Sequence, residues 1–272
     1  MKLIFFSKML QELTLPQLAE TAHRWGLDGF DLCVRPGFPV CPDNVAEALP
    51  QAAALLRAEG LDIPMVTGHF DLLAPTHPTA EPLLAAMEQA DIRHLKLGYF
   101  PYRPWEMDYR QALDSARRTL AAWEPLARRH HVRICYHSHS RQNLGLNGAS
   151  LAHLFDGLDP DCFGVYLDPA HLLVEGEDPA TAIGMVRPWL ALIALKDVAI
   201  TRAEQNGHGS PKPVWTLAGN GMVDWTHVFD ALDKAGFDGP CSVHCEFRSA
   251  IPDHFHENAQ REVDFFRTFV HH

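Results

Sequence analysis

The chain has 272 residues, of which 47% are hydrophobic, so it is long enough to bury a large core. Its 34 acidic residues outnumber its 23 basic ones for a formal net charge of −11, which argues against a nucleic-acid or anionic membrane surface. We therefore expect a small neutral or weakly charged partner, with no nucleic acid and no membrane.

The cysteines and the first residues predict a cytoplasmic protein. None of the six cysteines forms a CxxC pair, and several lie inside apolar runs, where a reduced thiol acts as a small hydrophobe. The apolar start, Met1 to Phe6, is too short for a signal peptide, and no later run approaches the ~20 apolar residues of a membrane span.

Short apolar runs alternate with longer helical patterns along the chain, which is typical of βα units. We count eight units, and without a visible linker they favour one α/β domain over residues 1–272, a (β/α)8 TIM barrel. The predicted strands are Lys2–Phe6, Gly29–Cys33, Asp62–Thr67, His94–Leu97, Val132–Tyr136, Gly164–Leu167, Leu190–Leu195 and Cys241–Cys245. The predicted helices lie near residues 15–25, 44–59, 80–90, 108–130, 148–157, 179–187, 224–236 and 257–269.

Residues that favour helix starts and ends support several of the predicted helix boundaries. Thr14 and Pro16 mark a helix start, and Gly26, Gly60 and Gly236 follow helices. The stretch from Val198 to Asp224 is rich in Gly, Pro and Asn, and we expect an irregular loop that covers the strand ends.

Ligand-type side chains follow two predicted strands, where barrel enzymes place their active sites. His137 and His139 are two residues apart and point to one face of a strand end, although both could be ordinary surface or structural histidines. Asp168 ends the next strand, where a buried carboxylate is costly unless paired or bound to a cation. The alternative is that Asp168 caps a helical turn and His171 faces solvent.

The last strand places His244, Glu246 and Arg248 in alternation on one face, which is either the barrel interior or an outward polar face. Lys196 and Asp197 end the seventh strand, either in a substrate role or as mutually compensating charges. Weaker candidates at earlier strand ends are Asp31, His69 and Lys96. The loops beside these ends contain the aromatic residues Phe70, Phe100, Trp105 and Trp215, which could line a ligand pocket or equally pack in a lid.

In their order these motifs resemble the xylose-isomerase-like barrel superfamily of sugar-phosphate isomerases and epimerases, which includes inosose dehydratase and tagatose epimerase. The resemblance covers most of the chain. It is carried by Tyr136-His137-Ser138-His139, by the stretch from Gly164 to His171, by Leu195-Lys196-Asp197, by the stretch from Leu217 to Trp225 and by the stretch from Gly236 to Pro240.

The resemblance implies one divalent ion held by Glu, Asp, His and Glu. Asp168 matches this set, whereas His137, Ala194 and His244 stand at the first Glu, the His and the last Glu positions. We expect a retained site with His137, Asp168 and His244 as ligands, which suit Mn, Fe, Co or Zn better than Mg. Proton transfer then falls to Glu246, His139 or Lys196, and substrate binding to His69, Lys96, His171, Arg248 and Trp215.

The expected function is a metal-dependent sugar isomerase or epimerase that removes a proton beside a carbonyl and forms an enediolate. A dehydratase or lyase with the same first step is an alternative, and so is a sugar-binding barrel without catalysis. An endonuclease for abasic DNA would need a basic surface, which the net charge disfavours. Barrels of this kind often pair through loops or helices, so a homo-oligomer is one expected form.

Overall fold

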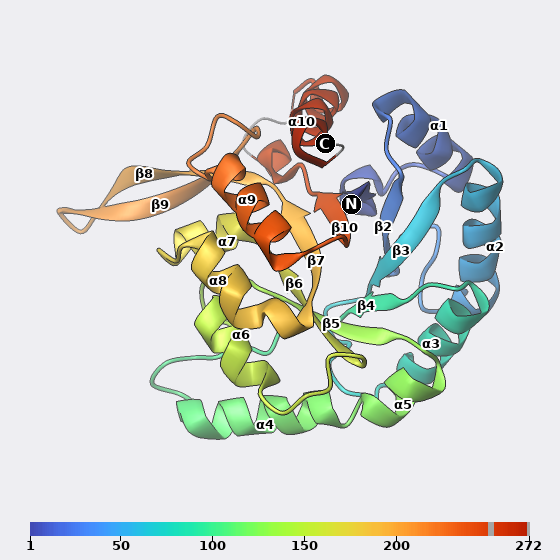
Figure 1. Ribbon diagram of the computed structural model, residues 1–272, viewed down its shortest axis with the longest axis horizontal. Coiled ribbons are helices and arrows are strands. Elements are labelled where there is room, and N and C mark those ends of the chain that lie inside the picture. The colour runs from blue at the N-terminus through green and yellow to red at the C-terminus, as the bar shows by residue number, and fades with distance from the viewer. Residues whose placement is uncertain (250–252, 271–272) are drawn as a thin grey trace.

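The computed structural model describes residues 1–249 and 253–270, without the side chains of 248 and 249. Parallel strands in this part of the chain close into one barrel in the order β1-β10-β7-β6-β5-β4-β3-β2 (Figure 1). The barrel strands are β1 Lys2–Phe6, β2 Gly29–Cys33, β3 Asp62–Thr67, β4 His94–Lys96, β5 Arg133–His137, β6 Phe163–Leu167, β7 Leu190–Leu195 and β10 Pro240–Val243. The predicted (β/α)8 barrel is confirmed.

The α-helices lie outside the strand ring (Figure 1). They are α1 Leu15–Trp25, α2 Val45–Ala58, α3 Ala80–Gln89, α4 Tyr109–Ala121, α5 Glu124–Arg129, α6 Gly148–Phe155, α7 Pro169–Val174, α8 Pro179–Val186, α9 Trp225–Ala235 and α10 Phe255–Val270. Three short 3-10 helices, η1 Ser7–Leu10, η2 Arg187–Trp189 and η3 Glu246–Ser249, complete the described elements. None of the helices in the described ranges is long and apolar enough to cross a membrane.

Barrel closure joins the two ends of the chain, because β1 pairs with β10 on one side and with β2 on the other. At the start of β2, Gly29 has a φ of 155°, and a Cβ there would lie 1.9 Å from the carbonyl oxygen of Asp62. Only glycine allows β2 and β3 to approach this closely, and the register between them shifts at this point.

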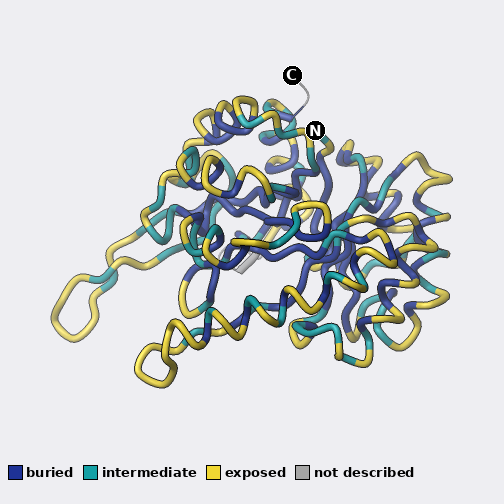
Figure 2. The backbone as a smooth tube through the Cα atoms, turned by 60° about the horizontal axis from the view of Figure 1, so that its bottom comes forward, coloured by how far each residue is buried: buried dark blue, intermediate teal, exposed yellow. Residues whose placement is uncertain are grey.

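The hydrophobic core has two layers. A small cluster inside the barrel contains Ile4, Met65, Cys135, Tyr166, Ala191, Leu192 and Ala194. A larger cluster lies between the strands and the apolar faces of the helices, where α1 buries Leu18, Ala22 and Trp25. Figure 2 shows the same arrangement, with buried segments in the middle and exposed ones on the outer faces and protruding loops.

The prediction of an irregular loop from Val198 to Asp224 is wrong up to Thr216, whereas residues 217–224 are irregular as predicted. Antiparallel strands β8 Asp197–Gln205 and β9 His208–Thr216 form a two-stranded hairpin that projects away from the barrel (Figure 1). Its two-residue turn is Asn206-Gly207, with φ values of 54° and 77°, which is the conformation that Asn-Gly favours in tight hairpins.

Several other element ends shift by one or two residues, and two further differences from the prediction change the elements themselves. The helix expected over residues 108–130 is two helices, because the chain turns at Trp123 and a new helix begins at Glu124, with Pro125 in its first turn. The last barrel strand ends at Val243, and Cys245 takes the left-handed conformation with a φ of 48° before η3. The strict alternation expected from His244 to Arg248 is therefore absent.

Candidate active site

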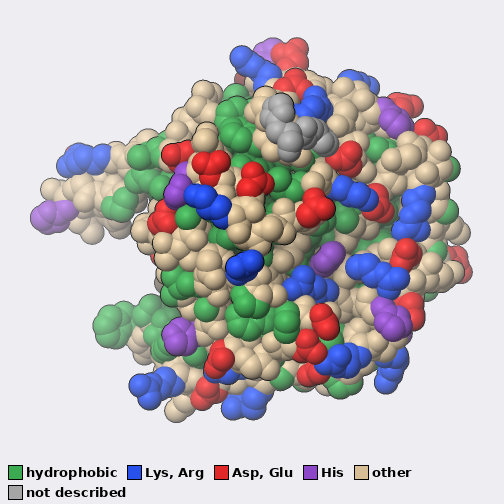
Figure 3. All heavy atoms as spheres, viewed as in Figure 1, with side chains coloured by type: hydrophobic (Ala, Val, Ile, Leu, Met, Phe, Trp, Pro, Cys, Tyr) green, Lys and Arg blue, Asp and Glu red, His purple; other side chains and the backbone are tan. Residues whose placement is uncertain are grey.

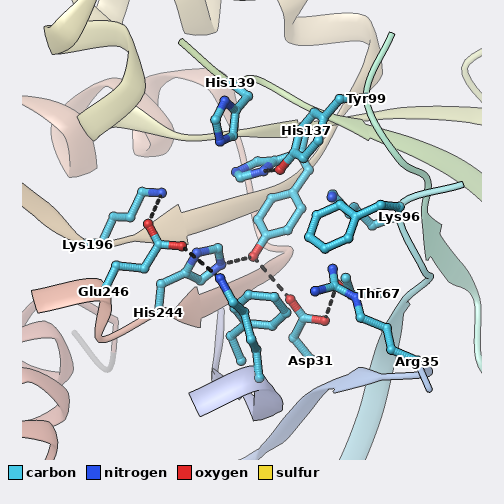
Figure 4. Close-up of a pocket in the computed structure, with 14 residues that line it drawn as sticks. Asp31, Arg35, Thr67, Lys96, Tyr99, His137, His139, Lys196, His244 and Glu246 are labelled. Carbon is cyan, nitrogen blue, oxygen red and sulfur yellow. Dashed lines mark hydrogen bonds and ion pairs between the residues drawn. The ribbon is translucent and has the colours of Figure 1, made fainter. Parts of the chain in front are cut away.

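A cavity of about 150 Å³ opens at the carboxyl ends of the barrel strands (Figure 4). This end of a (β/α)8 barrel is where loops and strand ends from many elements meet. The lining side chains come from almost every strand end: Phe6, Lys8, Asp31, Arg35, Thr67, Phe70, Lys96, Tyr99, His137, His139, Tyr166, Lys196, His244 and Glu246.

Lys196 forms the centre of a buried charged cluster at one side of the cavity. Its Nζ lies 3.0 Å from Asp168 Oδ2 and 2.8 Å from Glu246 Oε2. It also lies 3.0 Å from His171 Nε2 and 4.5 Å from the centre of the Trp215 ring. Lys196 is 2% exposed and Asp168 is fully buried, so this ion pair is shielded from water, whereas the Glu246 side chain is 20% exposed.

The ion pairs fix the charges in this cluster. Burial alone would lower the pKa of Lys196, but Asp168 and Glu246 outweigh it and raise that pKa. Burial would raise the pKa of Glu246, but Lys196 and His244 hold it at about 2. The pKa of Asp168 is lowered against the effect of burial, mainly by Lys196. One ammonium therefore faces two carboxylates at neutral pH.

A histidine chain extends from this cluster. The Lys196 ammonium can only donate, so His171 Nε2 accepts, and His171 Nδ1 donates to Ser140 Oγ at 2.8 Å. Burial and Lys196 lower the pKa of His171 well below its usual value, which agrees with a neutral ring. The His139 ring lies against it with centroids 4.1 Å apart, and His139 Nδ1 donates to the Ser140 carbonyl at 3.0 Å.

A second network lies deeper in the barrel. Thr67 Oγ1 donates to Asp31 Oδ1 at 2.6 Å, and the Tyr166 hydroxyl lies 2.6 Å from His244 Nε2 and 3.4 Å from Asp31 Oδ2. Burial raises the pKa of Asp31 to about 6, while the bond from Thr67 opposes the shift. His137 lies between the two networks, because its Nε2 lies 3.2 Å from Asp168 Oδ2 and its ring centre lies 4.5 Å from that of Tyr166. Its Nδ1 lies 2.8 Å from the Tyr99 hydroxyl.

The predicted site residues divide into four groups, of which the last is His69 alone. Those that line the cavity are Lys96, His137, His139, Lys196, His244 and Glu246. Asp168, His171 and Trp215 contact Lys196 but do not line the cavity. Arg248 has its side chain outside the described part of the structure.

His69 belongs to a neighbouring groove of about 620 Å³. Its Nε2 lies 2.8 Å from Thr79 Oγ1, and burial lowers its pKa. The groove shares Lys8, Arg35 and Phe70 with the central cavity. Of the remaining loop aromatics, Phe100 stacks on Tyr136 with centroids 5.4 Å apart, and Trp105 is fully exposed.

Two alternatives from the sequence are settled by these contacts. Asp168 does cap α7, accepting from the His171 N–H at 3.1 Å, but His171 is 2% exposed and does not face solvent. Lys196 and Asp197 do not compensate each other. Asp197 instead accepts backbone N–H groups of Val198, Gly219, Gly221 and Val223, and a Cβ at Gly221 would lie 2.0 Å from its Oδ1.

Sequence reasoning did not single out Arg35, Thr67, Tyr99 or Tyr166 as site residues. Thr67 and Tyr166 lie within apolar strand runs, which conceal a polar group that points into the barrel. Tyr99 lies in the stretch after Lys96, where only its position past a strand end could have marked it.

The donor atoms do not fit the expected divalent ion. Among the described residues, only one group of three His, Cys, Asp or Glu side chains has its donor atoms all within 4.8 Å of one another, namely Glu124, Asp159 and Cys162. Both carboxylates of that group already pair with Arg128. His137, Asp168 and His244 do not converge in this way. Ala194, at the position of the family histidine, packs in the apolar barrel cluster, and the cation beside Asp168 and Glu246 is the Lys196 ammonium.

The sequence profile of the family described as the xylose isomerase-like TIM barrel matches residues 19–269. The chain belongs to this family. It is 30% identical over 122 residues to an inosose dehydratase of Lacticaseibacillus casei, a match that covers 42% of this chain and 41% of the relative. The chain thus spans less than half the length of this curated relative.

Two solved structures share the fold over nearly the whole chain. A D-psicose 3-epimerase from Clostridium cellulolyticum H10, solved with D-tagatose, has a TM-score of 0.76 at 15% identity and covers 99% of each chain. The IOLI protein, solved with a bound zinc atom, has a TM-score of 0.75 at 15% identity, again over 99% of each chain. At such identities the likeness concerns the fold.

Proposed function

We propose that the protein is a carbohydrate enzyme that removes the proton beside a carbonyl group of a small keto sugar or inosose. The observation that carries this proposal is the Lys196 cluster, where a buried ammonium holds the Glu246 carboxylate at the wall of a small polar cavity. The ammonium keeps this carboxylate ionised and therefore able to accept a proton.

Each group in the cavity has a definite part in this proposal. Glu246 and the Nε2 of His139 are proton acceptors at the cavity wall. Lys196 is a permanent cation and positions Glu246, so it does not accept the proton. Lys96 and Arg35 present N–H donors to substrate oxygens, while the Tyr99 hydroxyl donates to His137 Nδ1. No divalent ion takes part in the proposed step, because the donor atoms of the described residues do not fit one.

Two outcomes follow from the same first step. Return of the proton on another carbon or face gives isomerisation or epimerisation, while loss of a β-hydroxyl gives dehydration. The name of the sequence relative, inosose dehydratase, favours dehydration, and the name of the structural neighbour favours epimerisation. The products decide between them.

The test is NMR of ketoses, inososes and 3-keto sugars incubated with the protein in D₂O. We expect deuterium beside the carbonyl of at least one sugar, and Glu246→Gln should slow this exchange at least ~100-fold, the size of one acid-base contribution. Glu204→Gln, on the exposed hairpin, is the matched control and should exchange at the wild-type rate.

The proposal fails if no sugar in the panel exchanges or if Glu246→Gln leaves the rate unchanged. Tight sugar binding without exchange or product would instead identify a sugar-binding barrel. Calorimetric titration of the same sugars separates that result from a protein that does not recognise them.

A further inference from the structure

Lys96 differs from Lys196 in one respect that matters for chemistry. Both lysines line the cavity, on opposite sides of it in Figure 4. Lys196 is paired with Asp168 and Glu246, whereas the Lys96 Nζ makes no hydrogen bond or ion pair with any described residue and lies 3.9 Å from the centre of the Tyr99 ring. Lys96 is 3% exposed, so bulk water does not solvate it freely either.

The charges around Lys96 favour its free amine. Burial and the nearby Arg35 lower its pKa to about 7, with Lys8 acting in the same direction and Asp31 and Cys33 opposing it. The Arg35 guanidinium is itself held at the mouth, where it stacks 4.3 Å from the Phe70 ring and donates to the Gly68 carbonyl. An unpaired amine in a cavity wall is the nucleophilic form of lysine.

The proton acceptor opposite Lys96 is a weak base. Glu246 is ion-paired at 2.8 Å, and a carboxylate held by an ammonium attracts a proton only weakly. A weak base removes a C–H proton only when a strong electron sink lies on the adjacent carbon. In metal enzymes a bound divalent cation is that sink, but the donor atoms of the described residues are not arranged to hold one.

We propose that the Lys96 amine adds to the substrate carbonyl and forms an iminium ion, which serves as the electron sink of the reaction. This inference rests on the proposed function and names its covalent residue. Glu246 lies across the cavity from Lys96 (Figure 4), so a substrate carried on Lys96 presents its neighbouring C–H to that carboxylate.

The steps balance without an oxidant or reductant. The amine nitrogen bonds to the carbonyl carbon, and the carbonyl oxygen leaves as water with one amine hydrogen and one proton from solvent. Glu246 takes the adjacent C–H proton, and the C–H electron pair moves toward nitrogen to give an enamine. Reprotonation, or loss of a β-hydroxyl as water, restores the iminium, and hydrolysis releases the product and the Lys96 amine.

The test traps the iminium by reduction. The full-length protein is incubated with dihydroxyacetone, and in parallel with every sugar that exchanges in D₂O, in the presence of sodium cyanoborohydride. We expect a one-to-one adduct whose mass is that of the probe less one oxygen atom, located on Lys96 by peptide mapping. Lys96→Arg and Lys96→Met should each abolish it, and Lys212→Arg, on the exposed hairpin, should not.

Thermal melting of the Lys96 variants shows whether they are folded. Even where a variant does not fold, the wild-type peptide map shows whether the adduct is on Lys96. No adduct on Lys96 with a sugar that the protein exchanges would overturn the inference and leave the proposed function in place. Equal labelling of Lys96 and Lys212 by dihydroxyacetone would also overturn it. Absence of exchange with every sugar overturns the proposed function. The dihydroxyacetone experiment then still shows whether the Lys96 amine reacts with a carbonyl group.

Discussion

At the scale of single residues, neighbours decide what a buried lysine does. Lys196 keeps its charge because two carboxylates lie within 3.0 Å of its Nζ, while Lys96 has no such partner among the described residues. The same reasoning separates two buried acids, Asp168 and Asp31. Asp168 is ionised beside Lys196, whereas burial raises the pKa of Asp31 to about 6 beside Thr67.

Replacing Lys196 should destabilise the fold as well as the site. Lys196→Met leaves the buried Asp168 carboxylate without its ion pair, and breaking a buried pair costs about 3–5 kcal/mol. Urea unfolding of this variant should show a loss of that order, and Lys212→Met should unfold like the wild type. A Lys196→Met protein as stable as the wild type would mean that Asp168 and Glu246 do not depend on this ammonium.

Glu262 should make stability fall as pH rises. Burial raises its folded pKa to about 8 from an ordinary value of 4.5, although its oxygens accept from the Ala218 and Cys245 N–H groups. Between those two pKa values Glu262 is protonated in the folded state and ionised in the unfolded state. The free energy of unfolding therefore falls as pH rises, by about 1.4 kcal/mol per pH unit in this range.

Glu262→Gln removes this titration. Urea unfolding from about pH 5 to about pH 8 should give a flatter dependence for the variant than for the wild type. Glu257→Gln, at an exposed position of the same helix, is the control and should keep the wild-type slope. Equal slopes for Glu262→Gln and the wild type would show that Glu262 is ionised in the folded protein.

At the scale of elements, the β8-β9 hairpin has a distal part and a basal part with different surroundings. Residues 204–209 are exposed, whereas Trp215 at the base lies 5.1 Å from the His171 ring and 4.5 Å from Lys196 Nζ, measured to ring centres. The base thus belongs to the site, and the tip does not contact it.

Shortening the hairpin should therefore leave the barrel intact. Joining Arg202 to Pro211 through an Asn-Gly turn keeps the Trp215 pairing with Val198 and should leave the melting temperature almost unchanged. Trp215→Ala should lower it, because the variant uncovers the Lys196 cluster. A large loss of stability in the shortened protein would show that the tip packs against something, such as a second copy.

The sequence predicts most elements because their signals are local. Four barrel strands, Lys2–Phe6, Gly29–Cys33, Asp62–Thr67 and Leu190–Leu195, match their predicted bounds, since apolar runs between helical patterns mark buried strands. The Asn206-Gly207 hairpin signal is also local, but the Gly and Pro content of the whole stretch favours a loop and conceals it. Cys245 is different, because nothing in its neighbours indicates a left-handed conformation.

At the scale of the whole molecule, barrel closure assembles the site from residues far apart in the chain. Asp31 and Tyr166 are 135 residues apart and share a hydrogen-bonded network, and Lys196 and Glu246 are 50 residues apart and share an ion pair. The sequence indicates the strand ends, but it cannot show that Lys196 rather than an ion lies beside Asp168, since that depends on how neighbouring strands are rotated and staggered. On the face seen in Figure 3, acidic and basic side chains are interspersed.

The most direct test of the account is metal content by elemental mass spectrometry on tag-free protein prepared without chelator, with melting temperatures in added Mn, Fe, Co, Zn and Mg. We predict far less than one ion per chain and no stabilisation, because Lys196 holds the cation position between Asp168 and Glu246. One bound ion per chain that is lost in Asp168→Ala would contradict the account and establish a metal centre at this barrel mouth.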